Sequence, residues 1–139
     1  MIRIKKIFPG ILPAPIRASE DAAGYDLSAT HDITLFPHCT ELIPTGYAWE
    51  IPPRYVGLIR DRSSLALAGL VTSAGVIDSD YRGEVKVLLT NTTNNPITIR
   101  AQQRIAQILL VKVLQEPLAV VQQLSTSHRQ EGGFGSTNP

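Results

Sequence analysis

The sequence is short of the features that would indicate a secreted, membrane or nucleic-acid-binding protein. Its 139 residues contain one cysteine, Cys39, so no disulfide bond can form within the chain. No apolar run approaches the ~20 residues of a membrane-spanning helix, and charges interrupt the apolar positions of MIRIKKIFPG at the start. Basic and acidic residues number 13 and 12, so no bulk charge favours nucleic acid. We therefore expect a soluble protein of a reducing, cytoplasmic compartment, with no stable binding to nucleic acid or membrane.

The chain also lacks the commonest short signatures of catalysis. It contains neither a GxxxxGK[ST] phosphate-binding loop nor a GxGxxG dinucleotide loop, and it has no GxSxG nucleophile elbow. Its three histidines do not combine with Cys39 in a spacing typical of zinc sites. Nothing near Cys39 would activate a thiolate, so we interpret this residue as inert. Evidence of function has to come from weaker patterns.

The length and composition are those of one globular domain. A chain of 139 residues, 43% hydrophobic and 18% charged, can fold without covalent cross-links. Ten prolines and ten glycines divide it into short segments, and Val85, Val87 and Leu89 alternate with the period of a strand. We predict an all-β sandwich or barrel. The expected strands lie near residues 2–7 and at 33–36, 46–51, 55–60, 83–90, 97–99 and 104–113, and a last apolar run follows at 118–121.

Two segments differ from this strand-rich pattern. SSLALAGL at 63–70 is typical of a helix, with Ser63 or Ser64 as the N-cap and Gly69 as the stop. Residues 125–139 contain three glycines and a single large apolar residue, Phe134, too little to order the segment by burial. We therefore divide the chain into a β-domain, 1–124, and a flexible glycine-rich segment, 125–139.

Five short stretches are unusual for a plain β-domain. In RDRSSLA (60–66), Arg62 precedes two serines at a helix start, where free backbone N–H groups favour an anion. In AGVIDSDYRGE (74–84), Asp78 and Asp80 lie on one side of the chain near a hairpin tip, which suits a metal or a general base. The other three stretches are AGYDLSA (23–29), RIAQILL (104–110) and RQEGGFGST (129–137).

The last two stretches each combine polar groups in a distinctive way. Strand alternation in RIAQILL places Arg104, Ala106 and Ile108 on one face and Gln107 on the other, with Ile105 and Leu109. The glycines of RQEGGFGST permit a nest of backbone N–H groups beside hydroxyls, a positive charge and an aromatic ring. Each stretch taken alone is equally compatible with ordinary turn or strand chemistry.

Together and in this order, the five stretches resemble the trimeric dUTPase family, the deoxyuridine triphosphate nucleotidohydrolases. The resemblance runs from Ala23 to Thr137, and GVIDSDYRGE and GGFGST carry most of it. It implies a jelly-roll-like distorted β-barrel with one short helix, assembled as a homotrimer whose sites are shared between subunits. It also implies Mg²⁺-assisted cleavage of dUTP to dUMP and pyrophosphate, which keeps uracil out of DNA and supplies dUMP.

The resemblance assigns a role to each motif residue. Asp78 matches the general base whose water attacks the α-phosphorus, and Tyr81 matches the ring that packs on deoxyribose and excludes a 2′-hydroxyl. The backbone of Gly75, Val76 and Ile77 matches the part that reads uracil, and Asp26 supports Mg²⁺ through water. The tail of one chain is a lid over a neighbour's site. The remaining assignments are phosphate contacts by Arg62, Ser63, Ser64, Gln107, Arg129, Gly135, Ser136 and Thr137, and stacking of Phe134 over uracil.

The chain departs from the usual family pattern at Asp61 and Thr72, lacks the Pro-Gly that often precedes the fourth motif in RAQQRIAQ (100–107), and has Asn138 in place of the frequent Gly. Asp61 stands where Gly or Pro is usual, and its charge would weaken anion binding unless it points away or pairs with an arginine. Thr72 stands where many members carry Asn near the uracil pocket. Two other functions stay open: a dCTP deaminase-like enzyme, against which the aromatic residue of IDSDYRGE argues, and a nucleotide-binding regulatory protein on the dUTPase scaffold.

Overall fold

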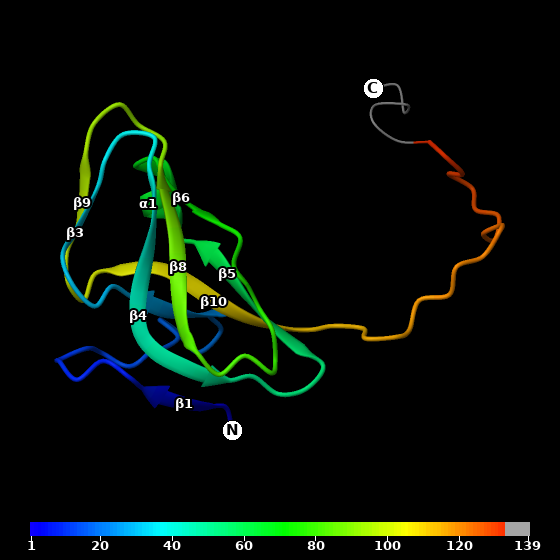
Figure 1. Cartoon of the computed structure of the whole chain (residues 1–139), viewed down its shortest axis with the longest axis horizontal. Coiled ribbons are helices and arrows are strands. Elements are labelled where there is room, and N and C mark those ends of the chain that lie inside the picture. The colour runs from blue at the N-terminus through cyan, green and yellow to red at the C-terminus, as the bar shows by residue number, and fades with distance from the viewer. Residues whose placement is uncertain (133–139) are drawn as a thin grey trace.

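The protein is described by a computed structural model over residues 1–132. Ten strands and one short helix make up this part of the chain (Figure 1). The elements are β1 (Arg3–Lys6), β2 (Gly24–Ser28), β3 (Ile33–Leu35), β4 (Thr40–Glu50), β5 (Tyr55–Asp61), α1 (Ser63–Leu67), β6 (Leu70–Ser73), β7 (Val76–Ile77), β8 (Glu84–Asn91), β9 (Ile97–Ile99) and β10 (Arg104–Lys112). The prediction of an all-β fold with one short helix is confirmed.

The strands of the described residues form three separate sheets, not one closed barrel. Two sheets have four strands, in the orders β1-β4-β8-β6 and β2-β10-β5-β7, and β3 pairs with β9 alone. All pairings are antiparallel. One hydrophobic core joins the inner faces of the sheets, with Trp49 of β4, Val87 of β8 and Ile108 of β10 among its members. Burial of this shared core holds the sheets together.

The alternation predicted for 83–90 is confirmed, whereas that predicted for 104–110 is wrong at one point. Val85 and Val87 of β8 are fully buried, and Leu89 is 1% exposed. In β10, by contrast, the consecutive residues Ile105 and Ala106 are both fully buried. The pairing with β2 shifts register between Arg104 and Ala106, and such a bulge reverses the alternation of side chains.

The predicted helix at 63–70 is too long, because its end turns into a strand. The helix α1 ends at Leu67, and β6 begins at Leu70. Gly69 has a φ of +88°, the left-handed conformation that ends helices, so its predicted role as the stop is confirmed. The N-cap is Arg62 without a side-chain cap, so the prediction of a serine N-cap is wrong.

After β10 the chain leaves the body of the domain (Figure 1). The N–H of Val113 donates to the carbonyl of Arg54, and residues 114–132 beyond it are exposed. The apolar run at 118–121 accordingly forms no strand. Within residues 1–132, no helix has the length and apolar character needed to cross a membrane.

Candidate functional site

The AGVIDSDYRGE motif forms an arch that runs from one four-stranded sheet to the other. The flanking strands β6 and β8 pair with each other, from Leu70 opposite Asn91 to Ser73 opposite Leu88. Between them the chain leaves this sheet, and β7 pairs with β5 of the second sheet instead. We call residues 74–83 the arch. Its conformation depends on both sheets.

The second residue of the arch is a glycine, Gly75, and any other residue at this position would be strained. Gly75 has a φ of +91°, and its carbonyl accepts a hydrogen bond of 2.8 Å from the N–H of Ile59. A Cβ atom at position 75 would lie 2.9 Å from the Cβ of Ile59. Left-handed backbone and the close approach to β5 together require glycine here.

A hydrogen-bonded turn follows and carries Asp78 and Tyr81. The N–H of Tyr81 donates to the carbonyl of Asp78 at 3.2 Å. The Nη1 atom of Arg82 donates to the carbonyls of Ser79 and Tyr81, at 2.7 and 3.0 Å. The side chain of Arg82 thus fixes the turn while the carboxylate of Asp78 stays exposed to solvent.

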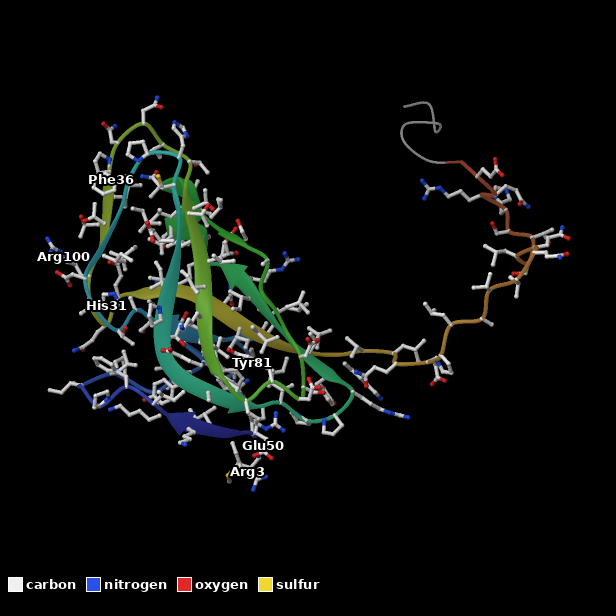
Figure 2. All side chains as sticks on the ribbon, in the orientation of Figure 1. Arg3, His31, Phe36, Glu50, Tyr81 and Arg100 are labelled. Carbon is white, nitrogen blue, oxygen red and sulfur yellow. The ribbon has the colours of Figure 1, made fainter. Side chains whose placement is uncertain are left out.

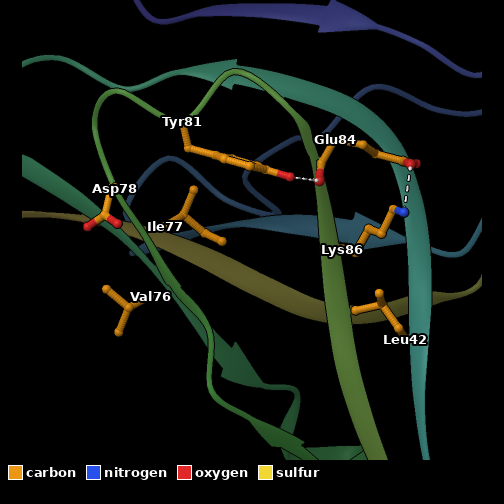
Figure 3. A pocket seen from close by; sticks show the side chains of 7 residues that line it. All are labelled: Leu42, Val76, Ile77, Asp78, Tyr81, Glu84 and Lys86. Atoms are coloured by element: carbon orange, nitrogen blue, oxygen red, sulfur yellow. Dashed lines mark hydrogen bonds and ion pairs between the residues drawn. The ribbon is translucent and has the colours of Figure 1, made fainter.

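Under the arch lies an open hollow of about 380 Å³ (Figure 3). The Oη of Tyr81 donates to the carbonyl of Glu84 at 3.1 Å, which holds the ring over this hollow. Figure 3 shows the ring of Tyr81 extending toward β8, whereas Asp78 lies on the opposite side of the arch. A largely apolar hollow with one carboxylate at its edge can bind a flat ring and hold a water beside it. Its lining residues are Leu42, Val76, Ile77, Asp78, Tyr81, Glu84 and Lys86.

A second polar cluster lies where β2, β10 and β5 are neighbours. Gln107 of β10 pairs with Asp26 of β2 on one side and with Arg60 of β5 on the other. The carboxylate of Asp26, whose side chain is 13% exposed, lies 2.9 Å from Nη1 of Arg104 and 3.4 Å from Nε of Arg62. Two guanidinium groups around one carboxylate leave net positive charge, which favours phosphate.

Four of the residues predicted to bind phosphate, Arg62, Ser63, Ser64 and Gln107, lie around this cluster. Ser63 and Ser64 are exposed at the start of α1, directly after Arg62. The Nε2 of Gln107 donates to the backbone carbonyl of Asp61 at 3.1 Å, which joins β10 to the end of β5. A Cβ atom on Gly24 would lie 2.7 Å from Oε1 of Gln107, which explains the glycine of AGYDLSA.

The carboxylate of Asp61 does not face the Arg62–Ser64 turn. Its Oδ1 accepts a hydrogen bond of 2.6 Å from the backbone N–H of Thr72 in β6. The sequence had left two options for Asp61, pointing away or pairing with an arginine. In the structure the Asp61 carboxylate points away from the turn.

The arch and the polar cluster around Asp26 are both connected to strand β5. Val76 of the arch pairs with Leu58, and Arg62 follows four residues later. Four residues of extended chain span ~13 Å at ~3.3 Å per residue. A rigid strand therefore sets the separation between the hollow and the anion-binding groups.

The described part of the glycine-rich tail, which ends at Gly132, does not reach the arch in this single chain. Arg129 lies in the exposed segment beyond β10, and its Nε donates to the carbonyl of Gly132 at 2.7 Å. Phe134, Gly135, Ser136 and Thr137 lie outside the described residues.

Two carboxylates with lowered pKa values lie outside both clusters (Figure 2). The pKa of Glu50 is lowered because Arg3 donates a hydrogen bond to it. The pKa of Asp32 is lowered by hydrogen bonds from the Ala101 N–H and from Arg100, both at 2.8 Å. Within residues 1–132 no three or more His, Cys, Asp or Glu side chains gather where they could hold a metal ion.

Sequence reasoning missed residues that reach the site only through tertiary structure. Leu42 and Lys86 line the hollow from β4 and β8, and nothing in their local patterns marks them. Glu84 also lines it and is the last residue of the AGVIDSDYRGE motif, which had given it no role. Arg82 could have been found, since it directly follows Tyr81 in the motif.

Comparison with known proteins agrees with this geometry. A dUTPase family model matches residues 12–138. The deoxyuridine 5′-triphosphate nucleotidohydrolase of Anaeromyxobacter sp. (strain Fw109-5) is 46% identical over 129 residues, which cover 91% of this chain and 88% of the relative. That of Nautilia profundicola is 42% identical over 139 residues, with 98% and 97% covered. The solved structure of the Staphylococcus bacteriophage 80alpha dUTPase with dUPNHPP matches with a TM-score of 0.94, at 27% identity and with 100% and 99% covered.

Proposed function

This chain belongs to the dUTPase family, and on that premise we propose how its residues act in a dUTP diphosphatase. The overall reaction is hydrolysis of dUTP to dUMP and pyrophosphate, a step that keeps uracil out of DNA and supplies dUMP. One observation supports the assignment of residues most directly. Strand β5 joins an apolar hollow, with Asp78 at its edge, to the polar cluster in which Arg62 and Arg104 flank Asp26.

Asp78 acts as the general base in this proposal. Its exposed carboxylate holds a water molecule and accepts a proton from it as the water oxygen attacks the α-phosphorus. A bond forms between that oxygen and phosphorus, and the bond from phosphorus to the oxygen leading to the β-phosphate breaks. The electron pair leaves with pyrophosphate, and dUMP keeps the new oxygen.

The arch selects the base and the sugar. The backbone of Gly75, Val76 and Ile77 pairs with uracil, and it is held for this by the bonds of the arch to β5. The ring of Tyr81 packs on deoxyribose and leaves no room for a 2′-hydroxyl. The hydrogen bond from Tyr81 to the Glu84 carbonyl supports this role, because it fixes the ring that must act as a steric barrier.

The polar cluster binds the triphosphate. Arg62, Ser63, Ser64 and Gln107 supply charge, hydroxyl and amide groups to the phosphate oxygens. Asp26 fits Mg²⁺ through water, because both its oxygens already face arginines and, among residues 1–132, no three or more His, Cys, Asp or Glu side chains gather into a metal cage. When bound, Mg²⁺ neutralises phosphate charge and keeps most of its ligands as phosphate oxygens and waters.

The remaining parts of the proposal concern the assembly. The chain forms a homotrimer of jelly-roll-like distorted barrels in the cytoplasm, with each site completed by neighbouring subunits. Residues 125–139 close over a neighbour's site, where Arg129, Gly135, Ser136 and Thr137 bind phosphate and Phe134 stacks on uracil. The course of residues 114–132 away from their own domain supports a role in a neighbouring subunit.

The test is pyrophosphate release from dUTP with Mg²⁺, run beside dCTP, dTTP and UTP. Asp78→Asn should bind dUTP normally and lose at least ~10²-fold in rate, the scale of a general base. Asp80→Asn, two residues along the same turn, is the matched control and should keep its rate. A normal rate for Asp78→Asn would remove the general-base assignment. Binding of dUTP by wild type without release would indicate a regulatory protein, and ammonia from dCTP a deaminase.

A further inference from the structure

We infer that Asp61 is a positioning residue, which fixes the base-binding arch relative to the phosphate-binding turn through its bond to Thr72. This inference rests on the proposed function, since it concerns how two parts of one substrate are held at once. Asp61 is the last residue of β5 and directly precedes Arg62. Its half-buried side chain therefore connects to the phosphate turn through the backbone, and to β6 through Oδ1.

The bond to Thr72 satisfies an N–H that no strand pairs with. β6 is the edge strand of its sheet, so alternate N–H groups point away from β8. The N–H of Thr72 donates to Oδ1 of Asp61 at 2.6 Å. A carboxylate thus stands where a further strand would supply a carbonyl, and it links the two four-stranded sheets at the entrance to the arch.

This bond continues the antiparallel pairing of β5 with the arch beyond the point where the two chains diverge. Gly57 lies opposite Ile77, Leu58 lies opposite Val76, and the N–H of Ile59 donates to the carbonyl of Gly75. Next along β5, the Asp61 side chain reaches the Thr72 N–H. The backbone bonds hold residues 75–77 of the arch, and the side-chain bond holds Thr72, just before the arch begins.

Asp61 is also anchored on its other side. Its carbonyl accepts the hydrogen bond from Nε2 of Gln107, and its backbone lies opposite Ala106 of β10. The bond to Thr72 consequently ties the start of the arch to a strand end that β10 holds in place and that carries Arg62. A substrate that contacts both the arch and the turn gains affinity from a fixed spacing, whereas a fragment that contacts only one does not.

Two substitutions separate the hydrogen bond from the charge. Asp61→Asn keeps an oxygen that can accept from Thr72, and it should leave KM and kcat for dUTP within about threefold of wild type. Asp61→Ala removes the acceptor, and we expect KM for dUTP to rise by ~10- to 100-fold, the scale of a hydrogen bond to a charged group, with a much smaller change in kcat. Binding of dUMP alone and of pyrophosphate alone should change less than about threefold.

The matched control is Asp32→Ala, which also removes a carboxylate that accepts from a backbone N–H, at 2.8 Å. Asp32 lies beside the β3–β9 sheet, so its loss should leave KM unchanged. Asp61→Leu, whose side chain branches at the same carbon but offers no acceptor, is measured in parallel in case the alanine variant does not fold.

Hydrogen exchange at the Thr72 amide gives a readout that does not depend on activity. Exchange should accelerate in Asp61→Ala or Asp61→Leu and stay slow in Asp61→Asn. The inference is overturned if KM is unchanged without the acceptor, if the asparagine variant is as impaired as the alanine variant, or if the alanine substitution weakens the binding of dUMP and of pyrophosphate as much as it raises KM for dUTP. A wild-type chain that releases no pyrophosphate would overturn the proposed function, while amide exchange and fragment binding would still decide the role of Asp61.

Discussion

Replacing Gly75 by alanine should remove most of the activity while leaving the fold intact. The native φ of +91° costs an L-residue about 1–3 kcal/mol, and the added Cβ would lie 2.9 Å from that of Ile59. Relief of that contact moves position 75 off β5 and breaks the 2.8 Å bond to the Ile59 N–H, a loss of about 0.5–1.5 kcal/mol. Because each 1.4 kcal/mol is tenfold, the combined cost predicts a fall in kcat/KM of roughly 10- to 1,000-fold.

The assay is steady-state pyrophosphate release from dUTP, with the midpoint of thermal unfolding measured on the same preparations. Gly69→Ala is the control, because Gly69 has a φ of +88° but packs against Thr92 and Thr93 instead of the arch. It should lower the unfolding midpoint and leave the kcat/KM of the folded protein near wild type. If Gly75→Ala kept kcat/KM within about threefold, the left-handed glycine would not be what holds the arch to β5.

Two further predictions concern the discrimination between ribose and deoxyribose, and the stability of the fold at low pH. Tyr81→Ala should let UTP compete with dUTP, whereas Tyr81→Phe, which keeps the ring and loses only the bond that fixes it to the Glu84 carbonyl, should lose much less of the discrimination against UTP; equal discrimination in all three proteins would dismiss the steric barrier. The lowered pKa of Asp32 means that its ionised form stabilises the fold above the unfolded pKa of ~3.9, and that this contribution is lost as pH falls through the folded value. Asp32→Asn should therefore have a lower unfolding midpoint than wild type near neutral pH and the same midpoint in strong acid, as thermal melts across pH would record. A difference that persists in acid would contradict stabilisation by the ionised carboxylate through its hydrogen bonds from Ala101 and Arg100.

Much of the fold could be read from local pattern, and the failures have identifiable causes. The alternation of Val85, Val87 and Leu89 located β8, because one face of that strand covers the core. β6 was missed because Leu70 continues a run of good helix formers, and only the left-handed Gly69 shows where the chain reverses. The bulge in β10 could not be predicted, since it depends on the pairing with β2.

The candidate site likewise has residues that the sequence could predict and contacts that it could not. Asp78, Tyr81 and Arg62 stand in motifs whose residue types and order are specific, so the sequence was enough to predict roles for them. The lining by Leu42 and the bond from Thr72 to Asp61 depend on contacts between sheets, which leave no local signature. The parts assigned to the tail and to the neighbouring subunits stay predictions.

The arch belongs to one sheet by its flanking strands and to the other by β7. It can therefore take its shape only after the two sheets have docked, late in folding. Enzyme activity should then report complete assembly of the domain, and no folding intermediate with a single formed sheet should turn over substrate. The same arrangement limits engineering, because grafting residues 74–83 as a loop onto another scaffold would leave behind the strand that gives the loop its shape.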